Sequence, residues 1–479
     1  MKILVLQLAR FGDIYATWPV LRALKRKYPK AKLHFLVRRH FAEACQGLDA
    51  VDRVWAFDTE AILAPVLEES VSIEESLKKL TGYLEILQNE KYDQVINLSF
   101  SPASSYLTHM ISGPETEIHG YTRFDDGTLR LPDEYSSFFY AQVGIGRPNR
   151  VHVVDLMAGV AGCELQPGDW SLPNNVVEID TPRPFIVIHI GASQERKSYP
   201  ARMWAKVIER TREWWDGDIV LVGSASEVEK SNAITAECGL TRVIPLVGQT
   251  RLPQLFGILL RARVFIGCDS GPLHMASLTK TPVLNLSFAS VNFWETGPKS
   301  AGSRILWAQS PVILEPEWVS EEAQRMIERQ PGRNTRAEVV SPVDFFASLF
   351  LDDHEDFEWD LIKALYFGFD MPPLRTHVAQ NAILRLSEIN NLAIEQIKRI
   401  AIDPKGQTPY EILNRADEMF HTVSQLVPDL APLARWVLTE KARVGPGPLG
   451  EVAAGTLAVH EAFQSQLNKF QIDSKEIQL

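Results

Sequence analysis

An aspartate that could act in catalysis follows the first apolar segment of the chain, in the stretch Arg10-Phe11-Gly12-Asp13. Glycine allows the backbone to turn tightly and lets a ligand approach it closely. At the start of a helix, the positive end of the helix dipole would favour the ionised form of Asp13. Asp13 is therefore a candidate general base, with Arg10 and Gly12 beside it. The simpler alternative is that Asp13 only caps the helix.

A second candidate stretch begins at His189 and runs through a glycine and a serine to a lysine. Gly191 would let backbone N–H groups approach a phosphate, while Ser193 and Lys197 would add a hydroxyl donor and a cation. The alternative is a polar loop between a strand and a helix, with Lys197 in solvent.

The stretch Asp269-Ser270-Gly271-Pro272-Leu273-His274 predicts a strand end followed by a helix start. Ser270 or Gly271 would cap this helix, whose free N–H groups form a natural diphosphate site. Asp269 could accept hydrogen bonds from sugar hydroxyls, and His274 could donate to a phosphate or pack locally. A small capped turn is the alternative interpretation.

A further strand end, Gly223-Ser224-Ala225, leads to Glu227 and Glu229. A carboxylate here could bind a ribose diol, as acidic residues do in nucleotide-binding folds. Both glutamates are also ordinary residues for the first turn of a helix. The stretch around Gly12, after the first strand, is not the GxGxxG fingerprint of dinucleotide-binding dehydrogenases, which disfavours that class.

The segments that must position these residues alternate between strands and helices. Strands are predicted at 2–8, 32–37, 94–98, 185–190, 219–222, 264–267 and 283–286. Helices are predicted up to residue 28, at 72–90 after a capping box at Ser72, at 201–215, 227–238 and 252–262, and from residue 272. This alternation indicates two successive doubly wound α/β units, with a linker near 165–184 and a ligand cleft at their strand ends.

The pattern changes to helices alone near residue 340. Helical spacing covers Thr376–Ala401, and Thr408 to Glu411 predicts a capping box with Pro409 at the first helical position. We therefore predict three domains, at 1–175, 176–335 and 336–479. The acidic residues around His354 lack the glycine and terminal glutamate of an EF-hand, which favours a solvated linker over a cation site.

Composition excludes several classes of protein. Of 479 residues, 45% are hydrophobic and 23% are charged, which excludes a disordered chain. The net charge of −11 argues against general nucleic-acid binding. We expect no signal peptide, and the four dispersed cysteines predict neither a metal knuckle nor disulfides, so we expect the protein in the cytoplasm.

A basic segment at 22–39 contains lysines and arginines but no carboxylates. The simpler interpretation is a solvated helix face. The alternative is a surface for an anionic acceptor, or peripheral association with the inner face of the cytoplasmic membrane.

Taken together, these stretches resemble glycosyltransferase family 9, the bacterial ADP-heptose:lipopolysaccharide heptosyltransferases. The resemblance covers residues 1 to about 330 and is carried by Lys2-Ile3-Leu4-Val5 with Gly12-Asp13, by Gly191 through Lys197 to Trp204, by Gly223-Ser224-Ala225 with Glu227, and by Asp269 to His274. It implies a GT-B fold, two Rossmann-like domains facing a cleft, with the nucleotide sugar bound mainly by the second.

The resemblance also implies roles for the candidate residues. Asp13 would be the base that activates the acceptor hydroxyl in an inverting transfer of heptose from ADP-heptose, without a catalytic metal or a further cofactor. The donor residues implied are Ser193, Lys197, Ser270 and Gly271 for the diphosphate, Asp269 for the sugar, and Glu227 or Glu229 for the ribose.

The helical region beyond residue 336 departs from this family and leaves the acceptor open. A glycan or a lipopolysaccharide-type acceptor is expected, with a protein acceptor as the alternative. A non-catalytic scaffold that binds sugar nucleotides and acts through its helices is the second class. A GT-B epimerase would need catalytic carboxylates that we could not place. The isolated cysteines do not resemble the clustered cysteines of the iron-binding branch that glycosylates autotransporters, so we expect no iron.

Overall fold

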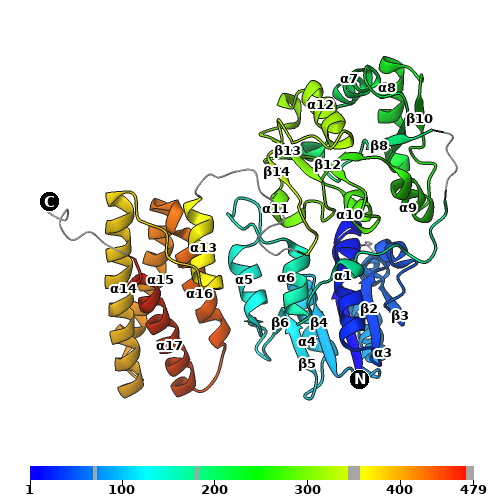
Figure 1. Ribbon diagram of the computed structural model, residues 1–479. Coiled ribbons are helices and arrows are strands. Elements are labelled where there is room, and N and C mark those ends of the chain that lie inside the picture. Colours follow the sequence, from blue (N-terminus) through cyan, green and yellow to red (C-terminus); the bar gives the residue numbers. More distant parts are fainter. Residues whose placement is uncertain (68–72, 179–182, 344–355, 471–479) are drawn as a thin grey trace. The chain divides into compact units, whose positions relative to one another are not determined.

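The computed structural model describes residues 1–67, 73–178, 183–343 and 356–470 (Figure 1). Ser72 of the predicted capping box, part of the predicted linker, and residues 352–355 of the acidic stretch lie outside these ranges. The described residues form two compact units. The first unit draws on Met1–Ser99, Ile111–Glu117 and Arg150–Asp353, and the second on Phe100–Met110, Ile118–Asn149 and His354–Leu479.

The first sheet has the strand order β3-β2-β1-β4-β5. Its strands are β1 (Lys2–Gln7), β2 (Lys32–Arg38), β3 (Arg53–Phe57), β4 (Gln94–Asn97) and β5 (Glu117–Gly120). β1 pairs in parallel with both β2 and β4. The strand order therefore reverses at β1, and the carboxyl ends of β1 and β4 meet at the point where α/β sheets bind ligands.

Helices of the first part of the chain follow the strands. They are α1 (Phe11–Lys27), α2 (Thr59–Leu67), α3 (Ile73–Gln88), α4 (Pro102–Ile111), α5 (Glu134–Gln142) and α6 (Val153–Val160). Helix α1 packs against α6. A two-stranded hairpin, β6 (Thr122–Arg123) with β7 (Leu129–Arg130), precedes α5.

The second sheet has seven strands in the order β10-β9-β8-β11-β12-β13-β14. They are β8 (Phe185–His189), β9 (Asp218–Val222), β10 (Val243–Pro245), β11 (Phe265–Cys268), β12 (Val283–Phe288), β13 (Arg304–Ala308) and β14 (Ala337–Glu338). β8 pairs in parallel with β9 and β11, so the strand order of the second sheet reverses between β8 and β11. β10, β13 and β14 were not predicted. β14 pairs antiparallel with β13 and extends this otherwise parallel sheet past residue 335.

Helices cover the second sheet on both faces, as its parallel strands require. α7 (Ala201–Arg212), α8 (Val228–Cys238) and α12 (Pro316–Ile327) pack together, whereas α9 (Leu252–Arg261) and α10 (Gly271–Leu278) pack on each other elsewhere (Figure 1). Every predicted strand is present within two residues of its predicted bounds. Two parallel doubly wound sheets confirm the predicted α/β class.

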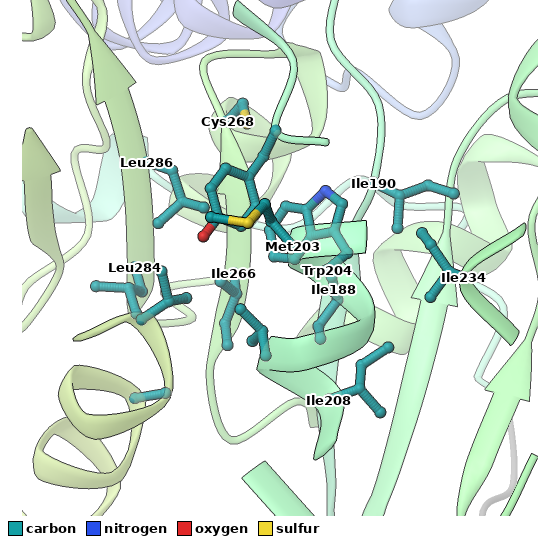
Figure 2. Close-up of a cluster of buried hydrophobic side chains, with 14 of the residues drawn as sticks. Ile188, Ile190, Met203, Trp204, Ile208, Ile234, Ile266, Cys268, Leu284 and Leu286 are labelled. Atoms are coloured by element: carbon teal, nitrogen blue, oxygen red, sulfur yellow. The ribbon is translucent and has the colours of Figure 1, made fainter. Parts of the chain in front are cut away.

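The core beneath the second sheet holds its strand ends in place. Figure 2 shows Ile188, Ile266 and Leu284 from neighbouring strands packed with Trp204 of α7. Trp204 is fully buried and meets Tyr199 edge to face, with ring centroids 5.0 Å apart. A close-packed core of this kind has low compressibility, so the loops leaving β8, β9 and β11 start from fixed points.

From residue 356 the described chain is helical, as predicted. The helices are α13 (Phe357–Phe367), α14 (His377–Ile402), α15 (Gln407–Leu426), α16 (Ala431–Val444) and α17 (Leu449–Leu467). The predicted capping box at Thr408 is wrong. α15 begins at Gln407 with Gly406 as its cap, so Pro409 is the third residue. Proline fits there because the first N–H groups of a helix have no acceptor within it.

The helical region packs on α5, which the sequence placed in the first domain. Phe138 of α5 meets Tyr366 of α13 edge to face, with ring centroids 4.9 Å apart. Ser137 Oγ donates to a carboxylate oxygen of Glu440 at 2.7 Å, and Gln142 Nε2 donates to Tyr366 Oη at 3.2 Å. Ser137 and Gln142 are buried. The helices therefore form one packed unit with a segment from the first third of the chain.

Candidate active site

Asp13 lies in the first turn of α1, as predicted. Its Oδ2 accepts a hydrogen bond from the backbone N–H of Arg10 at 3.0 Å, so the carboxylate does cap the helix. Its side chain is half-buried at the carboxyl end of β1. Capping fixes where the carboxylate points, and this is compatible with a second role as a base.

The start of α1 lies against the start of α10. A Cβ added to Gly12 would lie 3.0 Å from Cδ2 of His274, and one added to Gly271 would lie 3.5 Å from the backbone nitrogen of Gly12. A Cβ at position 12 would therefore crowd the His274 ring, whereas one at position 271 would make an ordinary van der Waals contact. Burial lowers the pKa of His274, although Asp269 and Asp13 both act to raise it. The carboxylates of the first and third candidate stretches thus share one histidine as a neighbour.

Lys197 and Asp269 form an ion pair across the reversal point of the second sheet. Nζ of Lys197 lies 2.8 Å from Oδ2 of Asp269, and the side chains are 16% and 13% exposed. Oδ1 of Asp269 accepts a hydrogen bond from Oγ1 of Thr296, also at 2.8 Å. Thr296 ends the short helix α11 (Phe293–Thr296), and no sequence signal marked it. Asp269, at the carboxyl end of β11, therefore also orients the Lys197 side chain.

Ser270 is the N-cap residue of α10, but its hydroxyl does not cap the helix. Ser270 Oγ instead lies 3.2 Å from Nδ1 of His189 and donates to the carbonyl oxygen of Cys268 at 3.1 Å. Burial lowers the pKa of His189 to about 4, so the ring is neutral at pH 7. Because the Ser270 hydroxyl does not accept from the first N–H groups of α10, it leaves these groups able to bind an anion.

Glu227 occupies the space above the ends of β8 and β9. Its Oε2 accepts hydrogen bonds from the backbone N–H and the hydroxyl of Ser224, at 2.6 and 3.0 Å. A Cβ on Gly191 would lie only 1.6 Å from Oε1 of Glu227, so Gly191 makes room for this carboxylate. Glu229 is exposed in the first turn of α8, and Ser193 is exposed on its loop. Of the two glutamates, Glu227 is the one at the strand ends.

The basic segment at 22–39 is largely paired with aspartates from elsewhere in the chain. The pairs are Arg22 with Asp49 at 3.3 Å, and Lys25 with Asp52, Arg26 with Asp169 and Arg39 with Asp58, each at 2.8 Å. Lys30 and Lys32 are exposed. The absence of carboxylates within the segment therefore did not indicate unpaired charge.

Other features carry less chemistry. A pocket of about 270 Å³ lies between α13 and the following loop, but it contains none of the candidate residues and includes the ion pair of Asp360 with Lys363. Within the described ranges, no group of three or more histidines, cysteines or acidic residues is placed to hold a metal ion. Nor is any described helix both long and apolar enough to cross a bilayer.

Two parallel sheets with sites at their strand ends, followed by helices, define a GT-B-like α/β fold with a C-terminal extension. The structure resembles that of Escherichia coli heptosyltransferase WaaC with ADP, with a TM-score of 0.52 and 18% identity over 68% of this chain and 100% of that chain. It also resembles a family 9 glycosyl transferase of Veillonella parvula, with a TM-score of 0.51 and 17% identity over 69% and 97% of the two chains.

Residues 83–316 match the model of glycosyltransferase family 9 (heptosyltransferase). Lipopolysaccharide heptosyltransferase 3 of Escherichia coli K12 is 21% identical over 291 residues, 59% of this chain and 81% of that relative. Lipopolysaccharide heptosyltransferase 1 of Campylobacter coli is 22% identical over 319 residues, 61% and 85% of the two chains. Helices α13 to α17 lie beyond the family segment. The resemblance drawn from the sequence is confirmed.

Proposed function

We propose that this protein is an inverting glycosyltransferase that transfers heptose from ADP-heptose to a glycan or lipopolysaccharide-type acceptor. One observation carries the proposal: the start of α1, with Asp13, lies against the start of α10, beside Asp269 and its partner Lys197. This brings a base and an anion site together. The names of the relatives support the choice of donor and acceptor class.

The reaction is a single displacement. Asp13 takes the proton from the acceptor hydroxyl, whose oxygen attacks the anomeric carbon as the bond from that carbon to the diphosphate breaks. The leaving diphosphate gains negative charge, which Lys197 and the N–H groups of α10 stabilise. Holding both substrates in line supplies much of the remaining rate enhancement. The positive charges and N–H groups named here account for the leaving group without a metal ion.

We assign the donor contacts as follows. Gly191, Ser193, Lys197, Ser270, Gly271 and His274 surround the diphosphate. Asp269 faces the sugar, and Glu227 binds the ribose hydroxyls. Arg10 and Gly12 line the acceptor side. The division into domains at residues 175 and 335 belongs to the proposal, as does action in the cytoplasm at the inner face of the membrane.

Thermal unfolding with ADP, UDP, GDP and dTDP tests the donor site. A nucleotide at 100 times its dissociation constant stabilises the folded protein by about 2.7 kcal/mol, which is readily measured as a rise in melting temperature. Selective stabilisation by ADP supports an ADP-heptose donor. Preference for another nucleotide would replace ADP-heptose as the proposed donor, and stabilisation by none would contradict the proposed donor site. The alternative, a protein acceptor, is tested by offering a protein in place of the glycan, with the same donor, and measuring transfer.

A further inference from the structure

A second lysine lies inside the donor region and has no assigned role. Lys230 is the third residue of α8, and its side chain is half-buried. Its Nζ donates a hydrogen bond to Oγ of Ser198 at 2.6 Å. Ser198 directly follows Lys197, so both lysines meet the same loop after β8.

The two lysines differ in how their charge is balanced. Lys197 is paired with Asp269, whereas no carboxylate among the described residues lies within 4.0 Å of Lys230 Nζ. Burial lowers the pKa of Lys230, and this is opposed by Cys268 and Glu227. Burying an ammonium group whose hydrogen-bond partner is a neutral hydroxyl costs folding free energy, and a bound anion would offset that cost.

The surroundings of Lys230 are those of the donor site. Its charge lowers the pKa of His189, and it interacts with Glu227 and with Cys268, the last residue of β11. These groups sit where β8, β9 and β11 end. Two carboxylates, Glu227 and Asp269, and two lysines lie at these strand ends, but only Lys197 and Asp269 form an ion pair. Without Lys230, the side chains would present a net negative charge to a diphosphate.

We propose that Lys230 is a second cationic ligand of the donor's diphosphate, acting beside Lys197 from the first turn of α8. The proposal depends on the donor site proposed above. Lys197 has a fixed position because it is paired with Asp269, but that pair carries no net charge. Lys230 supplies the positive charge that attracts the diphosphate. Both ammonium groups then stabilise the leaving diphosphate.

Calorimetric titration of the full chain with ADP and with adenosine tests this. Lys230→Met should weaken ADP binding at least about tenfold and leave adenosine binding within about twofold, because only ADP carries the anion. Lys230→Arg should restore most of the affinity. Lys206→Met, which changes an exposed lysine of α7, is the matched control and should bind as wild type.

Ser198→Ala separates direct binding from positioning. It removes the hydrogen bond to Lys230 but leaves the ammonium, so ADP affinity should stay within about threefold of wild type. Equal losses in Ser198→Ala and Lys230→Met would overturn the proposal, because Lys230 would then act only through the loop. Unchanged or equally weakened binding of ADP and adenosine in Lys230→Met would also overturn it. If wild type bound no ADP, the donor proposal itself would fail.

Discussion

Nζ of Lys197 lies 2.8 Å from Oδ2 of Asp269, and the pair joins the loop after β8 to the end of β11. Both side chains are more than four-fifths buried, since 16% and 13% of them are exposed. An ion pair in this setting holds a fixed geometry, unlike a pair in open solvent. It places one ammonium group at the point where the strand order of the second sheet reverses.

Replacing Lys197 should separate binding of the phosphates from binding of the nucleoside. Lys197→Ala removes the ammonium and leaves Asp269 without its cation, so the site repels a diphosphate. We expect ADP affinity to fall by about tenfold or more and adenosine affinity to change little. Titration calorimetry measures both. Equal weakening of the two ligands would place Lys197 outside the phosphate site.

The two glutamates after β9 offer a matched pair of variants. Glu227→Gln should weaken ADP binding by roughly tenfold, because a carboxylate holds a diol more tightly than an amide does. Glu229→Gln, in an exposed position, should not. Gly191→Ala should mimic the loss at Glu227, since its Cβ would displace that carboxylate. Titration with 2′-deoxy-ADP completes the test: if Glu227→Gln weakened it as much as ADP, Glu227 would not bind the 2′-hydroxyl.

Removing the helical region should damage the rest of the protein. A chain that ends before α13 would expose Phe138, which is 3% exposed, together with the buried amide of Gln142. Apolar surface of this kind promotes aggregation. We expect the shortened chain to aggregate in size-exclusion chromatography, where full-length protein elutes as a single species. A soluble shortened chain with the native melting temperature would show that α5 folds without its helical partners.

Acid should loosen α14 and α17 through His460. Its Nδ1 lies 2.7 Å from Oδ1 of the buried Asn390, and burial lowers its pKa to about 4. The unfolded chain, with a pKa near 6.5, takes up a proton first as pH falls, so stability is full above pH 6.5 and declines towards pH 4. Up to about 2 kcal/mol is lost by pH 5.

Hydrogen exchange of α14 and α17 at pH 7 and pH 5 measures this loss. His460→Gln cannot titrate and is the comparison. Protection should fall less on acidification in this variant than in wild type, after correction for intrinsic exchange. An identical fall in both proteins would show that other groups set the acid sensitivity.

The sequence predicted where several candidate residues lie when their position followed from local pattern. Asp13, Glu227 and Asp269 each follow a buried apolar strand, and parallel strands bring their carboxyl ends to one edge of a sheet. The local sequence pattern was therefore enough to predict that these residues lie at the strand ends. Thr296 and Lys230 reach the same edge from helices that follow later, and only the tertiary fold brings them there.

Other misses share this cause. The ion pairs of the basic segment 22–39 were not predicted, because the partners, such as Asp49 and Asp169, lie in parts of the chain that no local pattern relates to it. The packing of α5 on α13 joins residues more than 200 positions apart. Apolar periodicity identifies that an element has a face to bury, but not which distant face covers it.

Asp13→Asn tests the central claim most directly. Asparagine keeps an oxygen that can accept the Arg10 N–H, so the helix cap and the fold persist, but it cannot take a proton. The rate of heptose transfer from ADP-heptose to heptose-deficient lipopolysaccharide should fall roughly 10²- to 10⁴-fold, with ADP affinity unchanged within about twofold. Unchanged transfer in Asp13→Asn would contradict the account and leave Asp13 as a helix cap alone.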